Sequence, residues 1–278
     1  MTMTSKDASS GKHTTSFLHK HLHHLASVLL LVVLLVAWQV LPAYFRLPEY
    51  ILPQLSSVLQ IYFEPGIIGL YAYHASVTLT EALSGLCIGA FLGFTLGVLF
   101  ASMPRLLQVV YPYIVSIQAV PKVAVAPLFV VWLGFGMSSK VLVVALLSFF
   151  PVLVNTISGM RSVDEDSIEL FRTIGASRLQ TLFKLSIPVA LPSVFSGLEI
   201  AVTISMIGAI VGEFVGAQAG LGVQILQAQF QLNVPGVFSI LIILAAIGVT
   251  LNWLVRYVRR KTLFWMPREK AVAAVSAE

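Results

Sequence analysis

Three glutamates that could bind or conduct a charged solute lie within or at the ends of long apolar segments. A carboxylate inside a membrane is costly, so such residues are candidates for function if these segments span one. We expect Glu81 at the outer interface, and Glu199 either reaching toward the inner interface or paired with Arg178 or Lys184. For Glu213, the sequence leaves open a role in a pathway or dimer contact and a plain surface position at a helix end.

One stretch resembles a phosphate-binding loop. It runs from Gly134 to Lys140, with Ser139 where the motif needs its second glycine. That glycine lets backbone N–H groups surround a phosphate after a strand, and here the context is an apolar segment instead. We therefore expect no nucleotide site and no enzymatic activity, so the energy for any transport must come from a partner or an ion gradient.

The histidines and the single cysteine offer little metal chemistry. Five histidines crowd the N-terminal tail, namely His13, His19, His21, His23 and His24. Such a cluster can bind metal, but its Ser-, Thr- and Lys-rich surroundings favour a solvated, disordered tail over residues 1–24. His74 is expected in an outer loop, where it satisfies a local hydrogen bond. Cys87 stands alone, so no cysteine-based site, metal or cofactor is expected.

Composition identifies the setting of these residues. Of 278 residues, 58% are hydrophobic and only 10% are charged, and the mean hydropathy is +0.91. A soluble domain carries about 25% charged residues, so a soluble enzyme and a disordered protein are both excluded. The pattern predicts an all-α polytopic membrane protein with about six transmembrane helices. The expected spans cover residues 25–44, 83–102, 106–133, 141–160, 191–211 and 237–258.

The distribution of Lys and Arg orients these spans. If the N-terminus is cytoplasmic, only Arg46, Lys122 and Lys140 of the 17 basic residues lie outside or embedded. Because short cytoplasmic loops collect Lys and Arg, we expect both termini in the cytoplasm. The net charge of +5 thus reflects topology and lipid contact, and no nucleic-acid partner is expected.

The third span is not a regular helix. Pro112, Pro121 and Pro127 interrupt it, and Lys122 lies within it. Proline removes a backbone donor, which a membrane tolerates only beside protein or a watery cavity. The sequence leaves three explanations: a pathway-lining helix, a packing kink, or a short excursion that brings Lys122 to the surface. In the second span, glycines at 85, 89, 93 and 97 predict a close helix-packing face.

The loop between the fourth and fifth spans, residues 162–187, predicts two short amphipathic helices. Ser162 with Glu165, and Ser177 with Gln180, are spaced as capping boxes. Gly175 between them can adopt the left-handed conformation that ends a helix. Short isolated helices are marginal in water, so these need a surface to pack on, either lipid or a cytosolic partner.

At this loop the sequence resembles the permease subunits of binding-protein-dependent ABC importers. Glu169 is followed by Gly175, and then by Leu185, Ile187 and Pro188 at the spacing of the family's coupling loop, although Leu170 and Phe171 replace two alanines. The stretches 127–136 (PLFVVWLGFG), 191–198 (LPSVFSGL), 212–217 (GEFVGA) and 220–222 (GLG) agree with the nitrate, taurine and aliphatic-sulfonate branch. The resemblance covers residues 75–258.

This resemblance implies a type I ABC importer permease fold, a location in the bacterial inner membrane and a set of partners. These are a cytosolic ABC ATPase, a periplasmic solute-binding protein and a second permease copy. The residues expected to couple to the ATPase are Glu169, Phe171, Gly175, Ala176, Ser177, Leu185 and Pro188. Expected pathway positions are Gln118, Pro121, Glu213 and position 204, which is Ile204.

The resemblance also suggests a domain plan and a substrate. Residues 25–74 would hold the first span and an outer loop, 75–258 the transport domain with coupling helices at 162–187, and 259–278 a cytoplasmic tail. Sulfonates, taurine or nitrate are the first expectation for the substrate, and a pyrimidine or other vitamin precursor is the alternative. An ion-coupled secondary transporter is the alternative of another class, although such carriers usually contain internal repeats and none is found.

Overall fold

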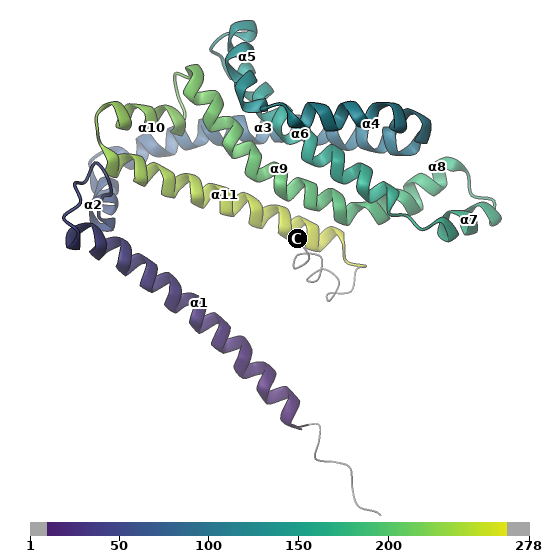
Figure 1. The fold of residues 1–278 in the computed structure, drawn as a ribbon, viewed down its shortest axis with the longest axis horizontal. Coiled ribbons are helices and arrows are strands. Elements are labelled where there is room, and N and C mark those ends of the chain that lie inside the picture. Colours follow the sequence, from purple (N-terminus) through teal and green to yellow (C-terminus); the bar gives the residue numbers. More distant parts are fainter. Residues whose placement is uncertain (1–9, 266–278) are drawn as a thin grey trace, which may run out of the picture.

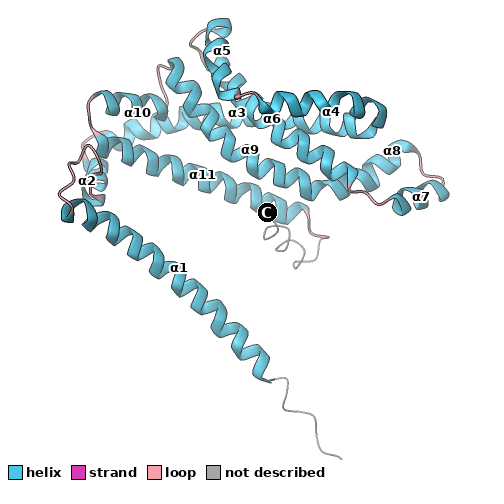
Figure 2. Cartoon of the chain, in the orientation of Figure 1, coloured by secondary structure: helices cyan, strands magenta, loops and turns pink. Residues whose placement is uncertain are grey.

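A computed structural model describes the backbone of residues 10–265 and the side chains of residues 25–265. In this part of the chain all regular elements are helices, and Figure 2 shows them joined by short loops. Their bounds are α1 Ser10–Tyr44, α2 Leu55–Gln60, η1 Ile61–Phe63, α3 Ile67–Ser102, α4 Pro104–Ala119, η2 Lys122–Val125, α5 Ala126–Leu133, α6 Met137–Arg161, α7 Glu165–Thr173, α8 Arg178–Thr181, η3 Leu182–Ser186, α9 Ile187–Gly216, α10 Leu221–Phe230 and α11 Val234–Thr262.

Five of these helices are long and apolar enough to cross a membrane, or six when the bent pair α4 and η2–α5 counts as one span. The predicted all-α architecture of about six spans is therefore confirmed. The two halves of the third span are bent by 80° at Pro121, so this span is two pieces and not one kinked helix. Proline supplies no backbone donor there, and Val120 is in an extended conformation.

The second span begins much earlier than we predicted. Helix α3 starts at Ile67, not near residue 83, and so His74 lies in a helix and not in an outer loop. The prediction was wrong because hydropathy detects only apolar stretches. The first half of α3 holds buried polar residues, including Thr78 and Glu81, which contact polar side chains of other helices.

Helix α1 extends away from the other spans (Figure 1) and contacts them mainly near its C-terminal end. There Trp38 Nε1 donates to the Pro53 carbonyl at 3.1 Å, and the Trp38 and Phe238 rings lie 5.8 Å apart. The helix begins at Ser10, so residues 10–24 are helical where we expected a disordered tail. Residues 12–41 contain neither proline nor glycine, so nothing in the backbone interrupts the helix.

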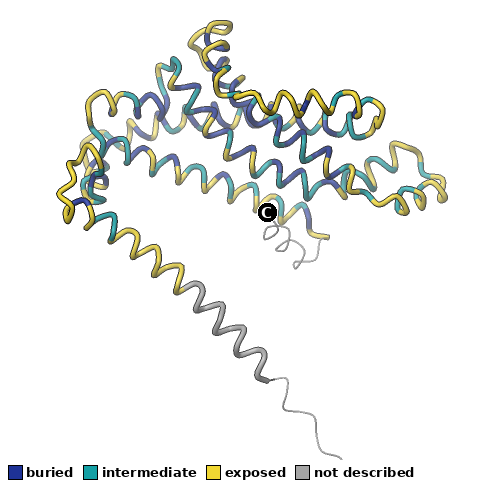
Figure 3. The backbone as a smooth tube through the Cα atoms, viewed as in Figure 1, coloured by how far each residue is buried: buried dark blue, intermediate teal, exposed yellow. Residues whose placement is uncertain are grey.

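Helices α3, α6 and α9 form the packed centre of the bundle, which appears dark blue in Figure 3. The predicted glycine face of α3 lies directly on α6. A Cβ atom at Gly93 would lie 2.6 Å from the Phe149 carbonyl oxygen, and one at Gly97 would lie 2.7 Å from Thr156 Cβ. Only glycine permits this approach of two backbones, so the packing face is within the subunit.

The two ends of the bundle carry different structures. Figure 1 shows α7 and α8 at one end, and α2 and α10 at the other. We expected α8 to be a separate short helix before a span marked by Pro188. Instead α8, the π-helical segment η3 and α9 follow without interruption, since η3 accommodates the missing Pro188 donor. This continuous helix runs from Arg178 to Gly216.

Candidate functional site

The first predicted cap of the loop at α7 is wrong. Helix α7 starts at Glu165 with Asp164 at its N-cap, and no side chain caps it. The Ser162 hydroxyl instead donates to the Gly159 carbonyl at 2.8 Å. Because α6 continues to Arg161, Ser162 belongs to the end of that helix, and it cannot also begin the next one.

The glycine elbow between α7 and α8 is formed as predicted. Gly175 has a φ angle of +78°. The amide of Ala176 donates to the Phe171 carbonyl at 2.9 Å, and the Gly175 amide donates to Arg172 at 3.0 Å. These two bonds define a Schellman motif, in which the left-handed residue allows the chain to turn back over the last helical turn.

The second predicted capping box is also present. The Ser177 amide donates to Gln180 Oε1 at 2.8 Å, and the Gln180 amide donates to Ser177 Oγ at 3.2 Å. Two local motifs thus fix the direction in which α8 leaves the elbow. Neither depends on contacts with the membrane helices, because all of the bonding atoms lie within residues 171–180.

Large apolar side chains of this loop are uncovered. Leu170 is 61% exposed, and Ile174, Leu179 and Phe183 are each exposed by about two thirds. Phe171, Leu185 and Pro188 are half-buried. We define the exposed side chains of Leu170, Ile174, Leu179 and Phe183 as the end patch; they are carried by α7, the elbow, α8 and η3. A patch of this kind outside the packed bundle marks a surface that binds another protein or lipid.

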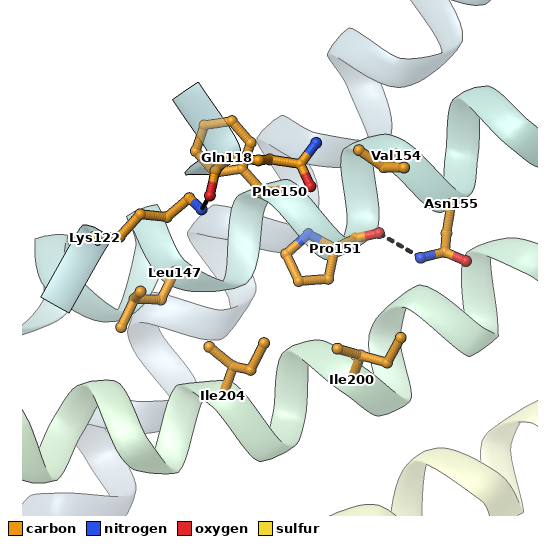
Figure 4. Close-up of a pocket in the computed structure, with 9 residues that line it drawn as sticks. All are labelled: Gln118, Lys122, Leu147, Phe150, Pro151, Val154, Asn155, Ile200 and Ile204. Carbon is orange, nitrogen blue, oxygen red and sulfur yellow. Dashed lines mark hydrogen bonds between the residues drawn. The ribbon is translucent and has the colours of Figure 1, made fainter. Parts of the chain in front are cut away.

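A cavity of about 340 Å³ lies where the third span breaks. Three of the residues that line it are polar: Gln118 from α4, Lys122 from η2 and Asn155 from α6. Figure 4 shows apolar side chains around them, and these are Leu147, Phe150, Pro151, Val154, Ile200 and Ile204. The cavity is therefore bounded by three membrane spans, namely the broken third span, α6 and α9.

This cavity brings together only some of the predicted pathway positions. Gln118 and Ile204 line it, whereas Pro121 does not. Ser205 is fully buried and donates to the Val202 carbonyl at 2.8 Å. Sequence reasoning missed Asn155, because a single polar residue in an apolar helix does not indicate which face the packing presents to a cavity.

Glu213 is buried and not at the surface. Thr78 Oγ1 donates to Glu213 Oε1 at 2.6 Å, and the Gly222 amide donates to Oε2. The Gly220 amide donates to His74 Nδ1 at 2.9 Å. Side chains of α3 and α9 therefore hold the first backbone amides of α10, which a helix leaves without internal partners. Of the readings considered for Glu213, the surface position is excluded.

Glu81 and Lys140 form a buried ion pair. Lys140 Nζ lies 3.2 Å from Glu81 Oε1, and both side chains are over 90% buried. Our expectation of an interfacial Glu81 was wrong, since α3 begins some four turns earlier than predicted and places this residue inside the bundle. Lys140 is the last residue of the stretch that resembles a phosphate-binding loop, and its ammonium group binds Glu81.

Glu199 pairs with a different helix than we predicted. Arg259 Nη1 lies 2.8 Å from Glu199 Oε1, and Arg256 Nε lies 3.4 Å from Oε2. Arg178 and Lys184 make no ion pair with it in the described residues. Helix α11 packs against α9. Arg178 and Lys184 precede Glu199 by several turns of the continuous helix that includes η3, and so they lie farther along its axis.

Comparison with known proteins gives a family for this arrangement. Residues 89–263 match the family described as "Binding-protein-dependent transport system inner membrane component". This range covers more than half of the chain and includes α4 to α11, with the elbow, the cavity and Glu213.

Several curated proteins resemble the chain over most of its length. A formylaminopyrimidine transport permease of Halalkalibacterium halodurans is 38% identical, over 81% of this chain and 89% of that protein. A riboflavin transport system permease of Chloroflexus aurantiacus is 37% identical, over 84% and 88%. A putative aliphatic sulfonates transport permease of Bacillus subtilis is 32% identical, over 86% of each.

A solved structure shares the fold. It is an inward-facing conformation of the MetNI methionine ABC transporter, with a TM-score of 0.64 and 18% sequence identity. The match covers 72% of this chain and 99% of the other. The likeness is one of architecture, and it confirms the predicted type I importer permease fold.

Proposed function

Since this chain belongs to the binding-protein-dependent transport system inner membrane components and is an ABC importer permease, we propose that the α7–α8 loop is where a separate ATPase subunit drives it. The observation that carries this proposal is the end patch beside the elbow. Leu170, Ile174, Leu179 and Phe183 are presented to the exterior on short helices that cannot be stable alone.

Charge supports a protein surface over lipid for this patch. Three acidic residues lie at the start of α7: Asp164 at the N-cap, and Glu165 and Asp166 in the first turn. All three are exposed. The inner leaflet is negatively charged and repels such a cluster, whereas it attracts Arg172, Arg178 and Lys184 farther along the loop, so the preference for protein concerns the first turn of α7. An ATPase cleft that receives an apolar helix with an acidic first turn fits both features.

The continuous helix from Arg178 to Gly216 gives this loop a mechanical route into the membrane. At about 1.5 Å per residue it spans the bundle, from the end patch past the cavity at Ile200 and Ile204 to Glu213. A displacement of α8 therefore tilts or shifts the wall of the cavity, and the contacts of Glu213 carry the motion to α10.

This proposal fixes an orientation and the remaining partners. The loop faces the cytoplasm, and with it both termini, while α2 and α10 face the periplasm, where the binding protein delivers solute. A second copy of the chain completes the pathway. The uncovered apolar side chains of α5, with Val131 80% and Trp132 65% exposed, support such a contact.

For the substrate, the relatives support two chemical classes. The formylaminopyrimidine and riboflavin permeases point to heteroaromatic vitamins or their precursors, and the sulfonate permease points to small oxyanions. The family supports ATP-driven import over the ion-coupled carrier that the sequence had left as an alternative.

The test of the coupling surface uses two matched phenylalanines. Phe183 belongs to the end patch and is 65% exposed, and Phe230 at the opposite end of the bundle is 88% exposed. Phe183→Glu is expected to abolish copurification with the ATPase and ATP-dependent uptake, whereas Phe230→Glu retains copurification. If Phe183→Glu binds the ATPase as the wild type does, the loop is not the coupling surface.

A further inference from the structure

A second cavity lies at the end of the bundle that carries α7 and α8 (Figure 1). Its volume is about 260 Å³, and its walls come from the first half of α4 and from Arg161, the last residue of α6. The α4 residues that line it are Pro104, Leu107, Gln108, Tyr111 and Pro112. Sites for drug-sized ligands measure roughly 300–1,000 Å³, so this cavity suits a single small polar group.

Three polar side chains of this cavity offer hydrogen-bond donors. Arg161 carries a planar guanidinium, Gln108 a carboxamide and Tyr111 a hydroxyl. Within the described residues, none of these three side chains makes a hydrogen bond or an ion pair. Their donors are therefore available to a ligand that comes from outside this part of the chain.

The positive charge of Arg161 is not compensated by an acid of the cavity. None of the described residues that line the cavity is acidic. The acids closest to Arg161 in the sequence, at positions 164–166, are exposed at the start of α7 and form no ion pair with it in the described chain. The cavity therefore favours an anion, and a ligand that also carries an ammonium group finds no acidic partner for it there.

The position of the cavity indicates an anion held at the membrane surface. Helix α6 has 25 residues, and at about 1.5 Å per residue its length exceeds the hydrocarbon core of about 30 Å. Its last residue, Arg161, therefore lies at the level of the lipid headgroups. On α4, Val109 and Tyr113 directly follow two lining residues and are 64% and 66% exposed. An apolar surface thus adjoins the donors, and a phosphate that carries acyl chains can use both.

We propose that this cavity binds the phosphate group of an anionic phospholipid in the cytoplasmic leaflet. Two N–H groups of Arg161 donate to two phosphate oxygens, and Gln108 and Tyr111 donate to other oxygens of the headgroup. Basic pockets between spans on the cytoplasmic side of a membrane are typical sites for phosphate headgroups. The choice of leaflet rests on the orientation in the proposed function, and the assignment adds a lipid partner to that function.

Native mass spectrometry of the purified full-length permease in neutral detergent, without an ATPase, tests the assignment. The probes are dioctanoyl-phosphatidylglycerol, dioctanoyl-phosphatidylcholine and inorganic phosphate. We expect one phosphatidylglycerol to be retained per chain, more tightly than phosphatidylcholine, and an equal concentration of phosphate not to displace it. Arg161→Gln should weaken this retention by about tenfold, the effect of one lost hydrogen bond between charged groups. Gln108→Leu and Tyr111→Phe should weaken it by smaller factors.

Two variants serve as controls. Arg260 is exposed in the last turn of α11 and does not line the cavity, so Arg260→Gln removes the same charge and should leave retention unchanged. Arg161→Lys keeps the charge without the planar fork and should fall between the wild type and Arg161→Gln. Because Arg161, Gln108 and Tyr111 are exposed, their variants should unfold at the wild-type temperature when no lipid is added.

The assignment is overturned if phosphatidylcholine is retained equally well, or if Arg260→Gln weakens retention as much as Arg161→Gln, which would indicate diffuse attraction and no site. Displacement by an equal concentration of phosphate would replace the lipid with a free anion. If no lipid is retained and Arg161→Gln instead loses copurification with the ATPase, the cavity is a protein contact. A failed lipid assay alone leaves the coupling role of α7–α8 to be judged by Phe183→Glu.

Discussion

Replacing Gly175 tests how strongly the elbow between α7 and α8 depends on a residue that adopts a positive φ angle. The residue has φ +78°, and an added Cβ atom would meet no atom within 4 Å. Alanine therefore creates no steric conflict with the rest of the chain, and its only cost is that of an L-residue in the left-handed region, about 1–2 kcal/mol. That free energy reduces the population of the elbow by about 5- to 30-fold.

Gly175→Asn is the matched comparison. Asparagine adopts the left-handed conformation more readily than other non-glycine residues, so its effect should be clearly smaller than that of Gly175→Ala. The assay is the affinity of the ATPase for the permease in nanodiscs, together with the thermal unfolding of the permease alone. We expect ATPase affinity to fall in the order Gly, Asn, Ala, with an unchanged melting temperature.

Two results would refute this reasoning. If alanine and asparagine weaken the ATPase equally, side-chain bulk at the interface is responsible and the φ angle is not. If alanine also lowers the melting temperature of the membrane helices, Gly175 contributes to the fold as a whole, which contradicts the locality of its hydrogen bonds.

Further predictions concern packing, charge and topology. Gly93→Ala should destabilise the detergent-solubilised protein by about 1–3 kcal/mol, because its Cβ enters the α6 backbone, whereas Gly69→Ala in the same helix meets nothing and should be neutral or slightly stabilising in the same denaturation assay. Lys140→Met should cost about 3–5 kcal/mol by leaving the buried Glu81 unpaired. Adding Glu81→Gln should recover part of this loss, and a double variant no better than the single one would contradict the pairing. Ser177→Cys, with the native cysteine replaced, should react with an impermeant maleimide only in inside-out vesicles, and labelling of intact spheroplasts would reverse the orientation.

The features that sequence reasoning predicted correctly share a local origin. The number of spans follows from hydropathy over about 20 residues, and the elbow follows from Gly175 and the Ser177–Gln180 pair, which bond within a few positions. The glycine repeat of α3 predicted a close packing face for the same reason, since one helix face is defined by spacing alone.

The failures at buried charges concern residues whose partners are distant in sequence. Glu81 was expected at an interface and Glu199 beside Arg178, yet their partners are Lys140 and Arg259. Thr78, a buried polar residue of α3 like Glu81, donates to the carboxylate of Glu213, which lies 135 positions away in the sequence. Spacing cannot reveal such pairs, because they depend on how far each helix is rotated and shifted against its neighbours.

By itself, then, the sequence determined a helical membrane chain with about six spans and a glycine elbow, because hydropathy and backbone conformation are properties of short segments. Only the tertiary structure decided which buried charges are paired and that Gln118, Lys122 and Asn155 share one cavity. The physical reason is that the contact of α3 with α6 and the break at Pro121 set the register between helices, and that register places these side chains together.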